Sequence, residues 1–137
     1  MDRMIFVNLP VRDMARSQAF FRQLGFDFDA RFTNEQCASL VIREDAIYAM
    51  LLAEPFFQTF TAKQVADARQ TAQVLICLSC SSREEVDALM AKALAAGATE
   101  PGAPKDNGFM YYRTFDDLDG HGWELMWMDR DAAPSQF

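Results

Sequence analysis

The amino-acid sequence predicts an α+β protein built from two copies of one βαβββ module. Each half of the chain opens with an apolar, strand-like run and continues with one helix-like segment that ends at a glycine. Further strand-like segments, separated by polar turns, complete each half. The two helix-ending glycines, Gly25 and Gly97, lie 72 residues apart, and this spacing indicates an internal repeat. A chain of 137 residues suits one domain made of two small halves.

The first module covers residues 4–54. Its opening strand is the run IFVNLPV at residues 5–11, which carries apolar residues on both of its alternating faces. Asp13 is a suitable N-cap for a helix that begins at Met14 and ends before Gly25. Three further strands are predicted at residues 27–33, 37–45 and 46–54, with polar breaks between them.

The second module covers residues 72–129 and opens with a strand at 72–80. Ser82 and Glu85 form a capping box at the start of the next helix, which ends before Gly97. One face of that helix is apolar at helical spacing: Val86, Leu89, Met90, Ala93 and Leu94. Strands at residues 110–117 and 121–129 follow a stretch that proline and glycine interrupt.

The connector between the modules, residues 55–71, has no counterpart in the second half. It contains the phenylalanines Phe56, Phe57 and Phe60, and Thr61 with Gln64 predicts a short helix after them. This segment can pack its phenylalanines under the domain, form a lid over a pocket, or contact a second subunit.

The charge balance excludes several classes of partner. The chain has 13 basic and 20 acidic residues and a net charge of −7, which opposes binding to nucleic acid and to anionic lipid. No apolar run approaches the roughly 18–20 residues that cross a bilayer. The first residues lack the pattern of a signal peptide. We therefore expect a cytoplasmic protein that binds neither nucleic acid nor membranes.

Three cysteines, Cys37, Cys77 and Cys80, are too few for a disulfide scaffold and cannot all pair within one chain. Cys77 and Cys80 form a CxxC inside a strand-like run, where residues three apart point to opposite faces. We therefore expect the cysteines to be small packing residues rather than a redox or zinc site.

Strand alternation suggests which side chains line a ligand site. Each module buries too little surface alone, so we expect the two sheets to pair edge to edge into one curled, eight-stranded sheet with a concave face. In the first strand the aliphatic residues favour the helix side, which leaves Phe6 and Asn8 for the concave side. Gln73 occupies the corresponding place in the second module.

Two sequence runs carry a family resemblance. The run V-x-D-M-x-x-S-x-x-F-F-x-x-L-G-F at residues 11–26 and the run D-D-L-D-G-H-G-W-E at residues 116–124 resemble the vicinal oxygen chelate superfamily. This superfamily includes glyoxalase I, extradiol dioxygenases, fosfomycin-resistance enzymes and bleomycin-binding proteins, and the chain is most similar to uncharacterised glyoxalase-related bacterial proteins. The resemblance implies a single glyoxalase/bleomycin-resistance-like domain over residues 1–137 and a homodimer.

The resemblance also implies positions for a divalent metal such as zinc, nickel, manganese or iron. Active members hold the metal with His, Gln or Glu from the first and last strands of each repeat. Glu124 matches the glutamate position of the last strand, whereas the first-module positions fall on Phe6 and Ala49. In the second-module first strand only Gln73 could coordinate. Because a divalent ion needs three or four convergent donors, the set Glu124 and Gln73 predicts an incomplete site.

The remaining candidates each have two interpretations. Glu124 is either a general base or ligand with a desolvated carboxylate, or a carboxylate that hydrogen-bonds at the rim. Tyr112 either faces the ligand, to donate a hydrogen bond or stack on a ring, or is an amphipathic strand residue. Met110 and Met126 are either an adaptable apolar lining or ordinary core.

The leading functional prediction is a protein that binds a small apolar or aromatic molecule in the cup without a complete metal site, as sequestering and resistance proteins do. The first alternative is a metal-dependent lyase or isomerase, similar to lactoylglutathione lyase, with Glu124 as base or ligand and with Gln73 and Asn8 assisting. The second alternative is a non-catalytic, dimeric interaction module whose cup is filled by its own side chains.

Overall fold

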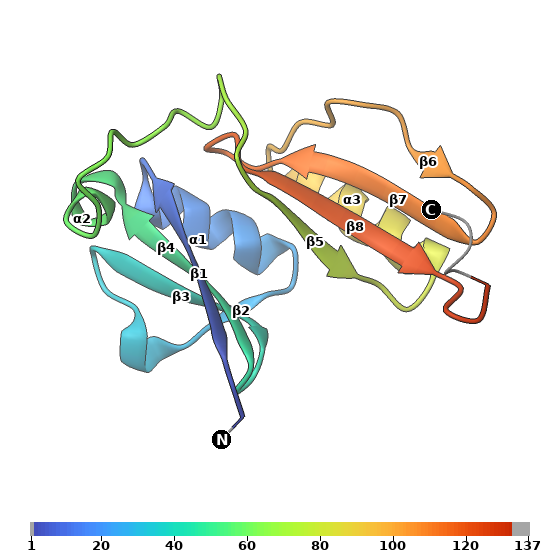
Figure 1. Ribbon diagram of the computed structural model, residues 1–137, viewed down its shortest axis with the longest axis horizontal. Coiled ribbons are helices and arrows are strands. Elements are labelled where there is room, and N and C mark those ends of the chain that lie inside the picture. The colour runs from blue at the N-terminus through green and yellow to red at the C-terminus, as the bar shows by residue number, and fades with distance from the viewer. Residues whose placement is uncertain (1, 133–137) are drawn as a thin grey trace. The chain divides into compact units, whose positions relative to one another are not determined.

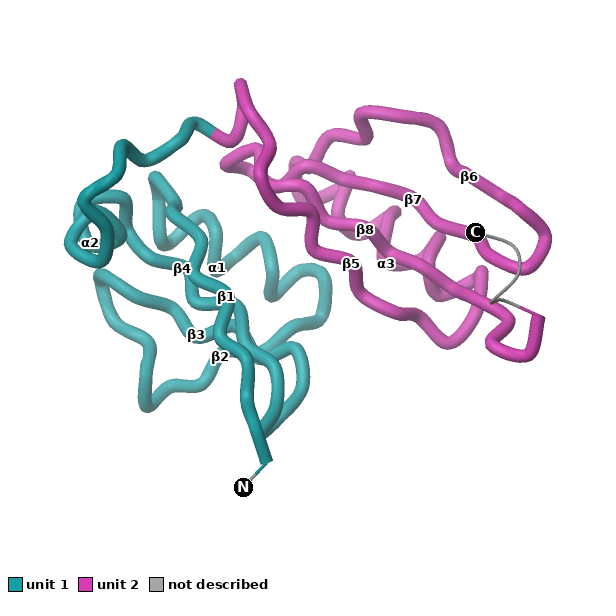
Figure 2. The backbone as a smooth tube through the Cα atoms, in the orientation of Figure 1, with its two compact units in different colours: residues 1–67 teal, residues 68–137 magenta. Residues whose placement is uncertain are grey.

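The computed structural model describes residues 2–132. Its contacts divide the chain into two compact units, Met1–Asp67 (unit 1) and Ala68–Phe137 (unit 2), coloured separately in Figure 2. The division falls inside the predicted connector. Both units contain a four-stranded sheet and one long helix, which confirms the α+β class and the repeated βαβββ module. That the two units form a single domain stays a prediction.

Unit 1 contains a mixed sheet in the order β1-β4-β3-β2. Strand β1 (Ile5–Val11) lies parallel to β4 (Ile47–Ala53), and β3 (Cys37–Arg43) lies antiparallel between β4 and the short β2 (Asp27–Phe28). Helix α1 (Met14–Gln23) connects β1 to β2 (Figure 1). The short helix α2 (Glu54–Gln58) follows β4 directly.

Helix α1 begins and ends where the local sequence predicts. The side chain of Asp13 accepts a hydrogen bond from the backbone N–H of Arg16 at 3.1 Å, as an N-cap does. After the helix, Gly25 has a φ of +99°, a conformation that costs glycine little. The buried side of α1 packs on β3 and β4 and presents Ser17, Phe20 and Phe21.

Unit 2 repeats this arrangement with the sheet order β5-β8-β7-β6. Strand β5 (Leu75–Ser79) lies parallel to β8 (Gly122–Met128), and β7 (Met110–Asp116) lies antiparallel between β8 and the short β6 (Lys105–Asp106). Helix α3 (Arg83–Ala95) packs on β7 and β8 (Figure 1). The core between helix and sheet consists of buried apolar side chains: Val86, Met90, Ala93, Phe115, Trp123 and Leu125.

A buried carboxylate fixes the turn between β7 and β8. One oxygen of Asp117 accepts hydrogen bonds from the backbone N–H groups of Asp119 and His121, at 2.9 and 3.0 Å. The other oxygen accepts a hydrogen bond from Nε1 of Trp123 at 3.0 Å. Burial raises the pKa of Asp117, and these donors oppose that shift. The aspartates predicted for this turn are therefore partly internal, and one of them anchors β8.

Three local predictions differ from the structure. The strand predicted at residues 27–33 is reduced to β2 and a 3-10 helix, η1 (Ala30–Phe32). This occurs because the carboxylate of Asp29 caps the backbone N–H of Arg31 and binds its guanidinium. The capping box at α3 is half formed: Ser82 accepts from the N–H of Glu85, but the Glu85 carboxylate accepts from Ser81 instead.

The short helix of the connector also lies elsewhere than predicted. It is α2, residues 54–58, with Pro55 in its first turn, and no helix begins at Thr61 or in the rest of the connector. The Thr61 hydroxyl accepts from the N–H of Lys63 two residues on, and the Gln58 amide donates to the carbonyl of each of those residues. These bonds hold the segment as a turn, because they use the groups that a capping box needs.

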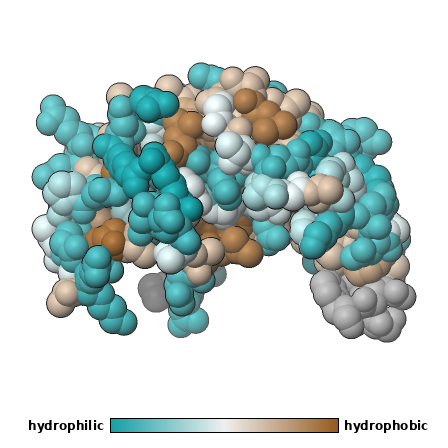
Figure 3. All heavy atoms as spheres, turned by 90° about the horizontal axis from the view of Figure 1, so that it is seen from above, coloured by the Kyte–Doolittle hydropathy of each residue, from teal (hydrophilic) through white to brown (hydrophobic). Residues whose placement is uncertain are grey.

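Some apolar side chains remain on the surface among hydrophilic ones, as the face in Figure 3 shows. Among the described residues, five large exposed hydrophobic side chains lie on or next to the edge strands β1 and β5: Met4, Ile5, Phe6, Val74 and Leu75. Within residues 2–132 there is no helix of the length and apolar character that a membrane span requires.

We predict that Gly120→Ala lowers the free energy of unfolding more than Gly25→Ala. Both glycines have positive φ, +90° and +99°, so alanine at either costs about 1–2 kcal/mol of strain. At Gly120 an added Cβ would also lie 2.8–2.9 Å from backbone atoms of Ala68 and Arg69, whereas the space around Gly25 is open. Denaturant unfolding of both variants measures the difference, and equal losses would contradict the tight approach at Gly120.

Candidate functional site

In unit 2 the side of the sheet opposite α3 gathers most of the predicted site residues. Strand register places Glu124 of β8 between Cys77 of β5 and Thr114 of β7. Two residues further along, Met126 lies between Ser79 and Tyr112. Because paired residues share a face and alternate residues return to it, these side chains lie on one surface. We call this surface the open face of unit 2: Leu75, Cys77, Ser79, Met110, Tyr112, Thr114, Glu124 and Met126.

The other side of the same strands is the core. Trp123, Leu125 and Phe115 are each 1% exposed. On the open face, Glu124, Tyr112 and Met126 are half-buried. Met110, the first residue of β7, is buried. The structure therefore brings together four of the predicted residues, from β7 and β8, which are 16 residues apart at most along the chain but adjacent in the sheet.

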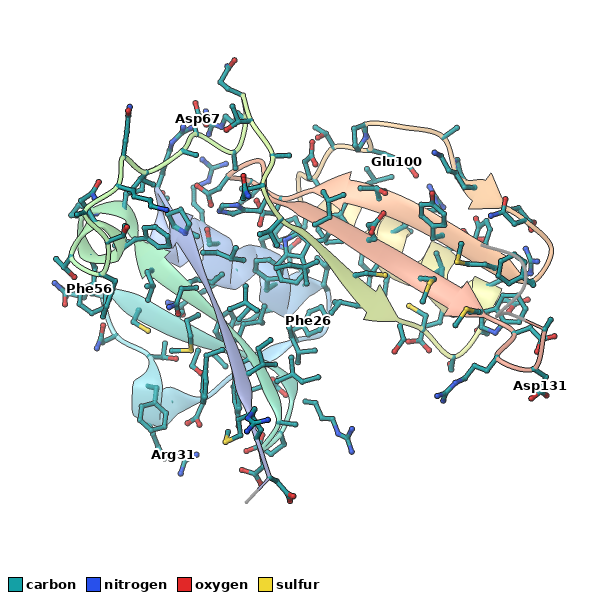
Figure 4. All side chains as sticks on the ribbon, viewed as in Figure 1. Phe26, Arg31, Phe56, Asp67, Glu100 and Asp131 are labelled. Carbon is teal, nitrogen blue, oxygen red and sulfur yellow. The ribbon has the colours of Figure 1, made fainter. Side chains whose placement is uncertain are left out.

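The Glu124 carboxylate forms no hydrogen bond or ion pair with any residue of the described range 2–132. Arginines of the same unit pair elsewhere. Arg113 binds Glu100, labelled in Figure 4, through two contacts of 2.9 Å on the helix side of β7. Arg83 binds Asp106 at 2.6 Å. The predicted rim hydrogen bond of Glu124 is thus not formed within the described residues.

An aromatic ring on the open face already receives a cation. Lys105 lies opposite Tyr112 across β6 and β7, and its Nζ lies 6.0 Å from the centre of the Tyr112 ring. Lys105 is exposed, whereas Tyr112 is half-buried. The face of the Tyr112 ring is therefore accessible to a positive charge. Such an electron-rich face attracts cations and also stacks on planar groups.

The cysteine prediction needs correction at Cys77. This residue is exposed on the open face instead of packed in the core, because β5 is the edge strand of its sheet. Although the residue as a whole is exposed, its thiol is partly buried, and this burial raises the pKa of Cys77. The negative charge of Glu124 raises that pKa further. Burial and the nearby Glu85 carboxylate raise the pKa of Cys80 to about 11. Neither thiol is in a disulfide, and neither is activated as a nucleophile.

The candidates from the first module lie on the corresponding side of the unit 1 sheet. Phe6 and Asn8 alternate with the buried Leu9 and Val11, so they face away from α1, and both are exposed. The Phe6 ring stacks on Tyr48 with centroids 5.3 Å apart. Sequence reasoning missed Tyr48, because only the parallel pairing of β1 with β4 brings these two rings together.

Gln73 lies outside the strand that was expected to orient it. Strand β5 begins at Leu75, and Gln73 lies in a bend before it and is exposed. Strand alternation therefore does not assign its amide to the face that Glu124 occupies, and the role of Gln73 in a ligand site stays a prediction.

The repeat also relates Glu124 to a different residue of the first module than predicted. The partner of Glu124 is Cys77, five residues before the N-cap Ser82, and the same spacing before Asp13 gives Asn8. The partner of Asn8 is Met50, so Met50 is the counterpart of Glu124. The predicted counterpart, Ala49, is fully buried on the helix side. An error of one residue moves a strand position to the opposite face.

The donors at these positions do not fit a resident divalent metal. Leu75, seven residues before Ser82, is the counterpart of Phe6, seven residues before Asp13. Phe6, Met50 and Leu75 offer no oxygen or nitrogen from their side chains, and Glu124 supplies the only carboxylate among these four residues. Within residues 2–132, no group of three or more His, Cys, Asp or Glu side chains is arranged to hold a metal ion. A chelate of three or four donors therefore cannot be assembled from this set.

Comparisons with known proteins agree with this architecture. A family model described as bleomycin resistance protein-like N-terminal matches residues 3–42. No curated protein matches the chain.

Solved structures match nearly its whole length. A hypothetical protein from S. aureus is 25% identical, with 93% of this chain and 94% of that one covered and a TM-score of 0.78. A glyoxalase-related enzyme from Fulvimarina pelagi is 18% identical, with coverage of 93% and 88% and a TM-score of 0.78. An antibiotic-binding protein from a Streptomyces species is 19% identical, with coverage of 93% and 97% and a TM-score of 0.65.

We predict that Glu124→Gln speeds the alkylation of Cys77 by iodoacetamide at pH 8 by about two- to threefold. Removing the negative charge beside the thiol lowers its pKa and increases the thiolate fraction. Peptide-resolved mass spectrometry measures each cysteine separately, and the rate at Cys37, in unit 1, serves as the internal control. An unchanged rate at Cys77 would show that the two side chains do not interact.

Proposed function

We propose that this chain is a member of the vicinal oxygen chelate superfamily and that it binds a small, largely apolar or aromatic molecule on the open face of unit 2 without a resident metal. The observation that carries the proposal is the composition of that face. Tyr112, Met110 and Met126 lie on the same face as a half-buried carboxylate, Glu124, on strands whose opposite side is fixed by a dense core.

Each of these side chains has a defined use in binding. The Tyr112 ring offers a flat surface for stacking, and its hydroxyl can donate to a ligand oxygen. The thioethers of Met110 and Met126 are polarizable and adapt to ligands of different shape. Phe6 and Asn8 of unit 1, and Gln73, stay predictions of ligand contacts from the sequence alone.

Two of the comparisons support the binding of a small molecule. The matching family model is named for bleomycin resistance, and the Streptomyces protein is named as antibiotic-binding. We transfer to this chain only the general property that these names suggest, which is the sequestration of a small organic molecule.

A metal-dependent lyase or isomerase, similar to lactoylglutathione lyase, has one supporting observation, the position of Glu124. The other positions of the chelate carry Phe6, Met50 and Leu75, so we derive no metal-dependent step. Without a metal, Glu124 could still accept a proton from a bound ligand, since its carboxylate has no partner among the described residues. Such turnover and a cytoplasmic location stay predictions from the sequence.

We predict that Tyr112→Ala weakens the binding of an aromatic ligand about tenfold, because the ligand loses its stacking surface. Tyr111→Ala is the matched control: Tyr111 faces the helix side, where its hydroxyl donates to Asp87 at 2.6 Å. A thermal-shift screen of aromatic metabolites and antibiotics finds the ligand, and calorimetry on both variants measures its affinity.

The same screen includes nickel, zinc, cobalt and manganese, which we expect to leave the melting temperature unchanged at millimolar concentration. Stabilisation by a metal, or equal losses of affinity in the two tyrosine variants, would contradict the proposal.

We also propose that the chain is a homodimer through its apolar edge strands. Ile5 and Leu75 are 54% and 58% exposed on strands that each have a single neighbour in their sheet, and such edges accept a further strand. Light scattering should give twice the chain mass of 15.5 kDa. Leu75→Lys should lower this mass. Phe60→Ser removes an exposed ring of the connector and should leave the mass unchanged. The reverse pattern would place the interface on the connector.

A further inference from the structure

The Glu124 carboxylate is a charge without a counter-ion on a largely apolar surface. Its register neighbours are Cys77 and Thr114, and Met126 follows it on the same face. Within the described residues it forms no hydrogen bond and no ion pair. A cation beside a half-buried carboxylate gains more Coulomb energy than it would in bulk water, because the effective dielectric constant near a protein surface is lower.

The cationic side chains of unit 2 that flank the sheet are engaged elsewhere. Arg113 binds Glu100 and Asp87 on the helix side, and Arg83 binds Asp106. Lys105 lies over Tyr112 at the β6 edge. Supplying the counter-ion of Glu124 is therefore a role that a ligand can take.

We infer that the open face of unit 2 selects ligands that carry a primary ammonium group on an apolar or aromatic body. This inference rests on the proposed function and names the class of molecule for that same site. An ammonium group has three N–H donors, and the carboxylate of Glu124 and the hydroxyl of Thr114, directly opposite it, are acceptors on adjacent strands.

The spacing along the strands sets the length of the ligand. Tyr112 and Met126 face each other two residues beyond Thr114 and Glu124. Two residues of a strand span about 6.7 Å, so the nitrogen and the ring of the ligand should lie about 6–7 Å apart. An arylalkyl amine with a three-carbon chain has this reach. Its ring would lie on Tyr112 and Met126 while its ammonium group contacts Glu124.

The test uses three probes of one shape and different charge: 3-phenylpropylamine, 3-phenyl-1-propanol and 3-phenylpropionate. Calorimetry gives the affinity of each for the wild-type chain, for Glu124→Gln and for Glu84→Gln. Glu84 is exposed on α3, so its variant removes the same charge away from the open face. This control matters because the net charge of −7 attracts every cation weakly.

We expect the wild-type chain to bind the amine about tenfold more tightly than the alcohol, and the carboxylate most weakly. Glu124→Gln should bind amine and alcohol equally, with unchanged affinity for the alcohol, and Glu84→Gln should behave as wild type. Backbone NMR shifts at Cys77 and Thr114 should accompany amine binding, and circular dichroism checks that the variants are folded.

The outcomes separate the inference from the proposed function. Equal binding of alcohol and amine to the wild-type chain overturns the ammonium preference and leaves small-molecule binding in place. If Glu84→Gln weakens the preference for the amine as much as Glu124→Gln does, the inference is also overturned. The net negative charge of the chain then explains the preference. Failure of all three probes to bind at millimolar concentration overturns both the inference and the proposed binding of a small molecule on the open face of unit 2.

Discussion

Phe20 and Phe21 of α1, and Val86 and Met90 of α3, bury one side of each four-stranded sheet beneath its helix. Each such side chain contributes about 1.5–3 kcal/mol when it is fully removed from water. Since successive strand residues point to opposite sides, this burial fixes which residues of every strand remain on the other side. A shift of one residue would expose the core, so the open faces are as strongly specified as the cores themselves.

The open face of unit 2 owes its geometry to the turn that precedes β8. Asp117 binds the backbone of that turn and Nε1 of Trp123, and Trp123 stacks against Phe115 with ring centres 6.4 Å apart. Trp123 is therefore held on the helix side, and Glu124, the next residue, must lie on the other. The buried carboxylate of Asp117 therefore fixes the side of the sheet to which the accessible carboxylate of Glu124 points.

The positions that the family resemblance assigns to a metal lack the donors that a chelate needs. They carry a phenyl ring and a thioether in unit 1, at Phe6 and Met50, and an isobutyl group in unit 2, at Leu75. Only Glu124 retains a charged oxygen donor. An apolar surface with one carboxylate suits an organic molecule better than an inorganic ion, because a divalent ion would keep most of its water.

The sequence alone determined the features that depend on neighbouring residues. The caps Asp13 and Ser82, the helix-ending Gly25 and the repeated module all follow from local patterns, and the structure contains them. It also named Glu124, Tyr112, Met126 and Met110 as candidate site residues, each with an alternative interpretation. The strand at residues 27–33 and the helix after Thr61 were wrong, since single side-chain hydrogen bonds there outweigh propensity.

Only the tertiary structure decided which strands lie next to each other and in which register. That pairing made Met50, rather than Ala49, the counterpart of Glu124, exposed Cys77 at a sheet edge, and brought Tyr48 to Phe6. It also left the Glu124 carboxylate between a thiol and a hydroxyl while nearby arginines bind other acids. Pairing energies come from residues far apart in the chain, so no local pattern contains them.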